Sequence, residues 1–232
     1  MCDAYAFARS SALLHPARDV LDCGSGSGHE LLATFGQCGT DKEGFHYAGL
    51  EWSRVAVEQG QAKGLDIVEA DLNRALPIET GSKDCVIAYS VIEHLLMPCS
   101  FVNECHRVLR PGGRLIILTP NISTYFTAIQ ILLGKMPSSG PHPDSNSLIE
   151  SEQPVSVSGV VSDDVTTDTP QHRHLVVFSF RVLREFLQSA GFVLERARGF
   201  GYYPLPMILQ PMFERMDVTH CHQIVFVCTR PV

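Results

Sequence analysis

A glycine-rich turn between a short apolar run and a helix-like segment constrains the fold of this chain more than any other feature. The stretch reads Arg18-Asp-Val-Leu-Asp-Cys-Gly-Ser-Gly-Ser-Gly-His-Glu30. Val20 and Leu21 end an apolar run that predicts a buried strand, and an apolar-periodic segment begins at Leu31. Strand, glycine turn and helix in this order bring backbone N–H groups and a helix N-terminus close to a ligand. We therefore expect a ligand-binding turn after the first strand.

The spacing of the glycines separates two kinds of ligand-binding turn. Dinucleotide-binding turns have the pattern G-x-G-x-x-G, whereas here Gly24, Gly26 and Gly28 alternate and His29 stands where the third glycine would fall. The chain also lacks a Tyr-x-x-x-Lys pair. A nucleotide-dependent oxidoreductase is therefore disfavoured, and an ordinary tight turn without a ligand is the simpler alternative at this point.

Composition limits the class of protein. The 232 residues include 18 Lys and Arg against 25 Asp and Glu, a formal net charge of −7 without a basic block, which argues against nucleic acid as a partner. The length fits one domain spanning 1–232. None of the eight cysteines forms C-x-x-C, which predicts reduced, buried thiols. With no signal-peptide pattern or membrane-spanning run, we expect a cytoplasmic protein.

Strand and helix patterns alternate at short intervals, which predicts a doubly wound, mostly parallel α/β sheet of seven strands, closed by an antiparallel hairpin. Strands are expected at 18–22, 45–50, 65–70, 84–89, 114–119, 192–197 and 223–229, and helices at 3–14, 30–37, 53–63, 98–109, 121–134 and 179–190. Residues 138–171 are rich in Ser and Pro, with no aromatic or basic residue, and predict a disordered insertion.

Acidic residues follow each of the first three predicted strands: Asp22, Glu51 and Asp71. The carboxyl ends of parallel strands line the ligand crevice of such a sheet. Glu51 is placed to accept hydrogen bonds from both hydroxyls of a ribose, and Asp71 from an adenine amine. Trp52 and Leu72 can pack on the faces of the ring. One surface carboxylate is usually just solvated, but three at successive strand ends predict a nucleoside-containing ligand.

Six sequence segments, taken in their order along the chain, resemble the motif series of the class I S-adenosylmethionine-dependent methyltransferases. The resemblance covers residues 15–125 and 172–229, and 119–121 and 174–192 are similar to the branch with ubiquinone-type O-methyltransferases. The segments that carry it are Val20-Leu-Asp-Cys-Gly-Ser-Gly-Ser-Gly, Gly49-Leu-Glu-Trp-Ser, Ala70-Asp-Leu, Asp84-Cys-Val-Ile, Glu93-His-Leu and Glu104-Cys-His-Arg-Val-Leu-Arg-Pro-Gly-Gly-Arg-Leu. The resemblance implies a Rossmann-like fold and S-adenosylmethionine as cofactor.

The resemblance also implies roles for individual residues. Cofactor contacts are expected from Asp22, Gly24, Ser25, Gly26, Gly28, Glu51, Trp52, Asp71, Leu72 and Tyr89, and acceptor contacts from Asn121 and Tyr125. The implied reaction is an in-line attack on the sulfonium methyl group, for which an oxygen nucleophile needs a base.

Histidine is the base best matched to neutral pH, and His94 and His174 are the candidates. A structural or cofactor-packing role for His94 stays open. Some ubiquinone-type enzymes carry Glu-x-x-Glu-His as a metal site. Here Ser90 replaces the first glutamate and leaves only Glu93 and His94, so no metal is predicted.

Two apolar stretches, 121–134 and the proline-punctuated loop 202–213, suggest a bulky apolar acceptor or contact with a membrane surface. Packing against each other as core is the equal alternative. The predicted function is transfer of a methyl group from S-adenosylmethionine to a small-molecule or lipid-like acceptor, by O-methylation. A non-catalytic methyltransferase-like binding subunit is the alternative, and no oligomeric state is indicated.

Overall fold

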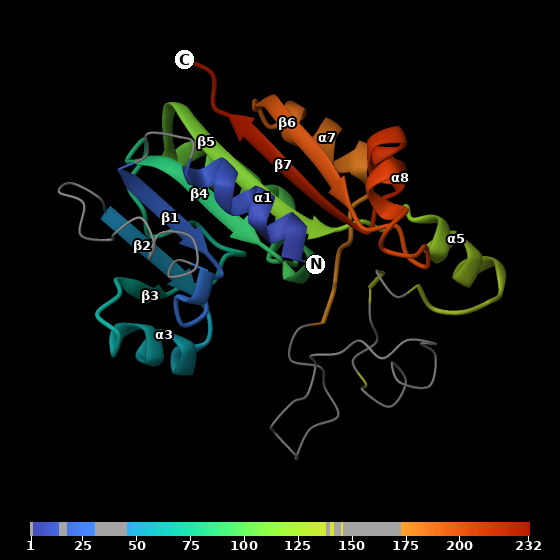
Figure 1. Ribbon diagram of the computed structural model, residues 1–232. Coiled ribbons are helices and arrows are strands. Elements are labelled where there is room, and N and C mark those ends of the chain that lie inside the picture. Colours follow the sequence, from blue (N-terminus) through green and yellow to red (C-terminus); the bar gives the residue numbers. More distant parts are fainter. Residues whose placement is uncertain (1, 14–17, 31–45, 138–139, 142–144, 146–172) are drawn as a thin grey trace.

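The computed structural model describes residues 2–13, 18–30, 46–137, 140–141, 145 and 173–232, and its strands form one twisted sheet (Figure 1). The strands are Asp19–Cys23 (β1), His46–Glu51 (β2), Ile67–Glu69 (β3), Lys83–Tyr89 (β4), Leu109–Pro120 (β5), Val193–Phe200 (β6) and Gln223–Thr229 (β7). Their order in the sheet is β3-β2-β1-β4-β5-β7-β6. The first five run parallel, and β7 lies antiparallel between β5 and β6. The predicted fold class is confirmed.

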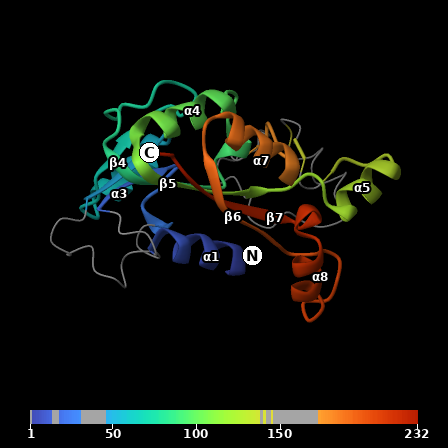
Figure 2. The same cartoon turned by 90° about the horizontal axis from the view of Figure 1, so that it is seen from above.

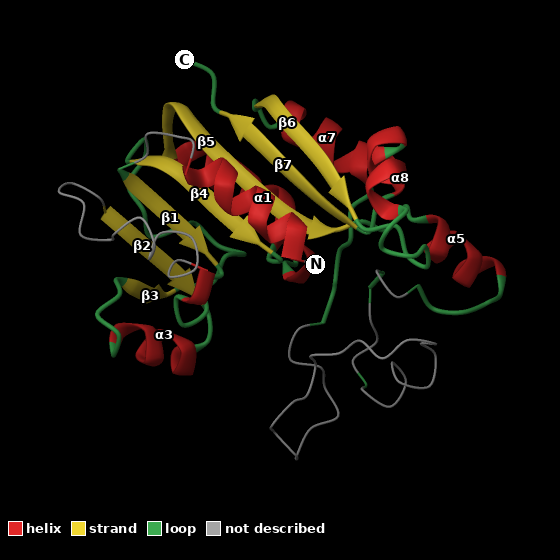
Figure 3. Ribbon diagram, in the orientation of Figure 1, coloured by secondary structure: helices red, strands yellow, loops and turns green. Residues whose placement is uncertain are grey.

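Helices cover both faces of the sheet (Figure 3). They are Cys2–Leu13 (α1), Arg54–Gln61 (α3), Pro98–Val108 (α4), Tyr125–Leu132 (α5), Phe180–Ser189 (α7) and Gln210–Met216 (α8), with 3₁₀ turns at Ile92–His94 (η1) and Val218–His220 (η2). Seen from above, α1 lies on one face, and α4 and α7 lie on the other (Figure 2). Among the described residues, no helix is long and apolar enough to cross a membrane.

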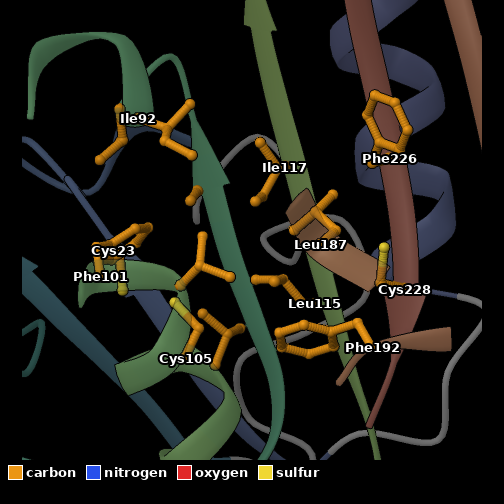
Figure 4. Close-up of a cluster of buried hydrophobic side chains, with 14 of the residues drawn as sticks. Cys23, Ile92, Phe101, Cys105, Leu115, Ile117, Leu187, Phe192, Phe226 and Cys228 are labelled. Atoms are coloured by element: carbon orange, nitrogen blue, oxygen red, sulfur yellow. The ribbon is translucent and has the colours of Figure 1, made fainter. Parts of the chain in front are cut away.

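Two apolar cores form because successive residues of a strand point to opposite faces. In β4, Val86 and Ala88 belong to the core under α4 and α7, whereas Ile87 and Tyr89 belong to the core under α1. Figure 4 shows part of the larger core, where the fully buried ring of Phe226 lies among residues from α7 and β5. This packing fixes the strand ends that carry the candidate site.

Helix boundaries follow from local capping. Ser53 caps α3, because its side chain accepts a hydrogen bond from the backbone N–H of Ala56. Ser179 caps α7 in the same way through the N–H of Val182. The buried residues of α7 are Phe180, Leu183 and Leu187.

Several boundaries differ from the sequence prediction, and three of the differences have a clear local cause. β5 begins at Leu109 rather than 114, because Leu109 pairs with Lys83 and the intervening residues 110–113 bulge out before pairing resumes. α5 begins only at Tyr125, since Thr124 caps it and the residues before it bond to other elements. The stretch 202–213 is not a continuous loop, because α8 begins within it at Gln210.

Several sequence predictions stay untested. The predicted helix at 30–37 and the predicted disordered insertion at 138–171 lie largely outside the described residues, so the single-domain interpretation with an insertion stays a prediction. For cysteines the prediction was partly wrong. Cys23, Cys85, Cys105, Cys221 and Cys228 are free and buried, but the free thiol of Cys99 is exposed.

Candidate functional site

The acidic residues predicted at strand ends do lie along one edge of the sheet. Cys23 of β1 pairs with Leu50 of β2, and Glu51 pairs with Glu69 of β3. The first three strands therefore end almost level with one another, and Asp71 follows the third. This is the carboxyl edge at which open α/β sheets bind ligands.

Glu51 is held against the glycine turn by backbone donors. The N–H of Gly26 donates to Oε2 at 2.9 Å, and the N–H groups of Trp52 and Ser53 donate to Oε1 at 3.0 and 2.9 Å. A carboxylate oxygen has two lone pairs, so Oε1 is already saturated by Trp52 and Ser53, and Oε2 can accept one further hydrogen bond. One hydroxyl of a ribose could supply it, rather than both as the sequence suggested.

The glycine turn leaves room above one of its residues. Gly24, Gly26 and Gly28 have φ of +74°, +53° and +83°. A Cβ on Gly24 would lie 2.5 Å from Cγ2 of Val91, and one on Gly28 would collide with Cδ1 of Leu65. A Cβ on Gly26 would meet nothing within 4 Å. The space over Gly26 is therefore a cradle that fits a cofactor, while its neighbours are glycines for packing.

Alanine substitutions should separate these two roles. Gly26→Ala places a methyl group in the open space, so we expect about tenfold weaker binding of S-adenosylmethionine, with a strain cost of only about 1 kcal/mol. Gly28→Ala adds a collision with Leu65 to that strain, so we expect a loss of about 2 kcal/mol in the free energy of unfolding. Calorimetric titration and denaturant unfolding of both variants measure this. Unchanged cofactor affinity in Gly26→Ala would contradict the cradle.

The turn is fastened to the strands beneath it. The N–H groups of Gly24 and Ser25 both donate to the carbonyl of Leu50. Asp22 is buried below them and accepts a hydrogen bond from the hydroxyl of Tyr47 at 3.0 Å. Burial raises the pKa of Asp22 to about 7, although the hydrogen bond from Tyr47 acts in the opposite direction. A cationic group such as the amine of a methionyl moiety would favour the ionised form of this carboxyl.

Tyr89 supplies an unsatisfied polar atom on the neighbouring strand. Its side chain ends β4 and is 8% exposed, yet its buried hydroxyl has no hydrogen-bond partner in the part of the chain that the structure describes. Tyr5 packs edge-on against the ring and keeps its own hydroxyl for Ser90. A buried hydroxyl is costly when unpaired, so a polar group of a bound cofactor fits this position.

Only some of the residues expected to contact an adenine ring are available for it. Trp52 is 78% exposed and free to stack on a ring, while Leu72 is buried. Asp71 is ionised because hydrogen bonds from the backbone and side chain of Asn73 hold its pKa below the ordinary value. One of its oxygens therefore already has two donors, which leaves fewer lone pairs for an adenine amine than the sequence suggested.

Asn73 also connects the turn after β3 to the loop after η1. Its Oδ1 accepts hydrogen bonds from the N–H groups of Leu96 and Met97 at 2.8 and 3.0 Å. Both of these apolar side chains are exposed. The carboxyl edge thus carries exposed apolar side chains beside the polar groups, as a site for a flat ring requires.

A second group of titratable side chains lies where β4 and β5 end. Glu93 of η1 is buried and accepts a hydrogen bond from Oγ1 of Thr119 at 2.9 Å. Burial raises the pKa of Glu93 to about 7. The backbone N–H groups of Leu175 and Val176 donate to the carbonyl of Glu93, which fastens the segment after residue 172 to this turn.

That fastening brings together the two histidines that the sequence proposed as bases. The rings of His94 and His174 are 5.1 Å apart, and Nδ1 of His94 lies 3.0 Å from the carbonyl oxygen of Arg173. One possible ligand atom each from Glu93, His94 and His174 lies within 4.8 Å of the others. Oxygen and imidazole donors at this separation could hold a divalent cation. The sequence did not predict this triad, because His174 is distant in the chain.

The buried acid gives a stability test. Because Glu93 has a folded-state pKa above its ordinary value of 4.5, the folded chain holds this proton more tightly than the unfolded chain. Stability should therefore fall as the pH rises from about 4.5 to about 7 and then level off, by roughly 3 kcal/mol for this group. Asp22 acts in the same direction.

We expect Glu93→Gln to remove its share of that pH dependence, so the variant should gain stability relative to the parent above pH 7. Urea unfolding with EDTA at pH 5, 6 and 7.5 measures it, and Glu79→Gln, at an exposed position, is the control. Parallel pH curves for Glu93→Gln and the parent would refute the assignment.

A further acid–histidine pair was missed by sequence reasoning. Oδ2 of Asp217 lies 2.6 Å from Nδ1 of His220 and also accepts a hydrogen bond from the hydroxyl of Tyr125 at 3.0 Å. The rings of Tyr125 and His220 stack with centroids 4.4 Å apart. Burial alone would raise the pKa of Asp217, but hydrogen bonds from Thr219 and His220 leave it well below the ordinary value. The Asp-x-x-His spacing is the signal that could have found it.

His220 and His222 do not share one strand face as a His-x-His pair on a strand would. His220 belongs to η2, before β7 begins, and its Nδ1 is engaged with Asp217. His222 is partly buried, and burial lowers its pKa.

Asn121, proposed to contact the acceptor, has a structural role. It is fully buried at the end of β5, where its Nδ2 donates to the carbonyls of Thr219 and Cys221. Its Oδ1 accepts from Ser123 and from the N–H of Phe180. Contact of Asn121 or Tyr125 with an acceptor stays a prediction.

Part of this chain matches known methyltransferases. Residues 21–117 match the family model described as a methyltransferase domain. A Mycolicibacterium smegmatis protein named "Probable S-adenosylmethionine-dependent methyltransferase" is 38% identical over 112 residues, covering 47% of this chain and 40% of that protein. The ubiquinone biosynthesis O-methyltransferase of Alkalilimnicola ehrlichii is 29% identical over 110 residues, covering 45% of this chain and 42% of the relative. The matches thus span about two fifths of these relatives' length.

Solved structures agree on the fold. An S-adenosylmethionine-dependent methyltransferase from Mesorhizobium loti superposes with a TM-score of 0.61 at 16% identity, covering 98% of each chain. Together these matches confirm the resemblance: residues 21–117 match a methyltransferase domain, and the fold is the one seen in S-adenosylmethionine-dependent methyltransferases. The cofactor of that class is S-adenosylmethionine, and the cradle over Gly26, the carboxylate of Glu51 and the unpaired hydroxyl of Tyr89 fit it.

Proposed function

We propose that the chain transfers a methyl group from S-adenosylmethionine to an oxygen of an apolar, lipid-like small molecule. The observation that carries the proposal is the arrangement along one sheet edge. Glu51 closes on the glycine turn at β1 and β2, and Glu93 with its two histidines lies where β4 and β5 end. The proposed nucleoside site and the proposed bases would thus lie side by side.

The chemistry divides between cofactor and protein. When bound, the cofactor supplies a methyl group on a positively charged sulfur. The chain holds the ribose through Glu51, keeps the turn open at Gly26 and provides an imidazole to take the proton of the acceptor hydroxyl. His94 and His174 are the proposed proton acceptors, because both face the same small cluster at the strand ends.

Two observations support the nature of the acceptor. The relatives from Alkalilimnicola ehrlichii and Acinetobacter baylyi carry the name ubiquinone biosynthesis O-methyltransferase, which favours oxygen as the methylated atom. In addition, exposed apolar side chains such as Leu96 and Met97 lie on the loop after η1, beside the proposed bases. An apolar ring or chain would cover them.

A transfer assay tests the proposal. The chain is incubated with methyl-labelled S-adenosylmethionine and one acceptor at a time. The three acceptors are a long-chain alkyl hydroquinone, the same hydroquinone without its chain, and a polar primary amine. We expect label in the chain-bearing hydroquinone. Label only in the amine would overturn the acceptor assignment. Saturable cofactor binding without any labelled product would instead favour a non-catalytic binding subunit.

A further inference from the structure

α5 is folded with its polar side inward. The helix buries Thr127 and Gln130, while Ile129, Ile131 and Leu132 are 52%, 56% and 85% exposed. Leu133, directly after the helix, is 71% exposed. A helix on the surface of a protein in water normally shows the opposite pattern. The outward face of α5 therefore suits an apolar environment.

A second stretch exposes side chains of the same kind. Between β6 and η2, Met207 and Ile208 are 85% and 87% exposed, and Met212 and Met216 of α8 are also exposed. The ring of Phe126 packs edge-on against Tyr203 at 4.6 Å, which brings the second stretch against α5. Both lie at the same end of the molecule in two views, with α5 projecting beyond the sheet (Figures 1 and 2). We call residues 125–136 and 203–216 the apolar end.

The polar groups of the apolar end indicate which kind of partner could cover it. Glu214 accepts a hydrogen bond from the N–H of Gly201, and Gln210 donates to the carbonyl of Leu205, so both are already engaged. A protein interface needs about one hydrogen bond per 100–200 Å², and side chains that could form them are scarce here. Aliphatic and methionine side chains instead match the acyl chains of lipids.

The remaining charges at the apolar end are cationic. Lys135 and Arg215 are exposed, whereas the whole chain has a net charge of −7. Long basic side chains can lie along apolar surface and reach phosphate groups at the edge of a bilayer. The charge pattern is therefore complementary to phospholipid headgroups.

We propose that the apolar end docks on the surface of a phospholipid bilayer, with the side chains of α5 and of residues 207–216 entering the acyl boundary. α5 starts five residues after β5 ends, so the docked face adjoins the carboxyl edge of the sheet. This goes beyond the proposed function, and an acceptor dissolved in the bilayer would have a short path to the site.

Vesicle co-sedimentation tests the proposal without cofactor or acceptor, so its result is independent of the methyl-transfer assay. The probes are vesicles of phosphatidylcholine alone and of phosphatidylcholine with phosphatidylglycerol. We expect the full chain to sediment with the mixed vesicles, and Leu132→Asp/Ile208→Asp to reduce the bound fraction at least tenfold. The matched control is Val55→Asp/Val182→Asp, which places the same charges on exposed apolar residues of α3 and α7 and should bind like the parent.

Two further measurements complete the test. Lys135→Glu/Arg215→Glu should weaken binding to the mixed vesicles more than to phosphatidylcholine, because only the former carry net negative charge. Sedimentation velocity without lipid shows whether the apolar end instead joins two copies. Failure of the parent to bind either vesicle would overturn the proposal. Binding of Leu132→Asp/Ile208→Asp to vesicles as strongly as the parent would also overturn it. The same holds if the parent forms a dimer that this variant dissociates, and the parent does not bind vesicles.

Discussion

Glu51→Ala is expected to weaken S-adenosylmethionine binding by roughly ten- to a hundredfold. The carboxylate is fixed by three backbone N–H groups, and Oε2 keeps one lone pair at the carboxyl edge. One charge-assisted hydrogen bond to a ribose hydroxyl, worth about 1.5–3 kcal/mol, accounts for this loss. Removing the side chain also releases the N–H of Gly26 from the geometry that keeps the turn open.

Glu69→Ala is the matched control for this experiment. Glu69 is exposed and pairs with Glu51 in the register of β2 and β3. Its substitution by alanine removes the same charge from the neighbouring strand end. Calorimetric titration should show parent-like affinity for it, and an intermediate affinity for Glu51→Gln, which keeps one oxygen acceptor. Equal affinities of Glu51→Ala and the parent would remove Glu51 from the cofactor site.

Asn121→Ala is expected to lower the free energy of unfolding by about 3–5 kcal/mol. The buried amide donates to two carbonyls of the segment before β7 and accepts from the N–H that opens α7. Each buried group left without a partner costs about 1–3 kcal/mol, and alanine cannot replace any of them. The variant should also loosen the segment that carries Asp217 and His220.

Guanidinium unfolding measures the effect, with Asn103→Ala as control. Asn103 is an exposed asparagine in α4, so its loss should change stability by less than about 0.5 kcal/mol. If Asn121→Ala were as stable as that control, the junction between β5, β7 and α7 would have to be held by other contacts.

Local patterns were enough to predict the sheet and to place the candidate cofactor-binding residues on its carboxyl edge. The alternating glycines and the apolar runs each act over a few neighbouring residues, and the parallel order follows from the alternation of strand and helix patterns. Glu51 could be named because the carboxyl ends of such strands share one edge whatever lies between them. Asp71 was predicted at the right place, but its engagement with Asn73 depends on a turn whose geometry the residue pattern does not fix.

The acceptor half depends on contacts between distant parts of the chain. His174 meets His94 only because the backbone after residue 172 bonds to Glu93, and nothing in either local sequence encodes that register. Asp217 and His220 were not predicted, although their Asp-x-x-His spacing is local in the chain. α8 was missed since prolines punctuate the stretch before it, although Pro211 sits in its first turn, where proline is tolerated.

The inverted face of α5 could not be inferred from composition either. The apolar excess of 121–134 predicted an unusual helix. Which side of it is buried depends on tertiary contacts, and these bury Thr127 and Gln130 against the hydrophobic pattern. The alternative that both apolar stretches serve only as core is therefore disfavoured, because Leu132, Met207 and Ile208 are exposed, although Tyr202 is buried.

Titration of the parent chain with S-adenosylmethionine, S-adenosylhomocysteine and NAD tests the central claim most directly. The account places a ribose-binding carboxylate, an open glycine cradle and an unpaired tyrosine hydroxyl around one cofactor site. It predicts saturable one-site binding of both adenosyl compounds by isothermal calorimetry and no saturable binding of NAD. Saturable binding of NAD with no heat from S-adenosylmethionine would contradict it.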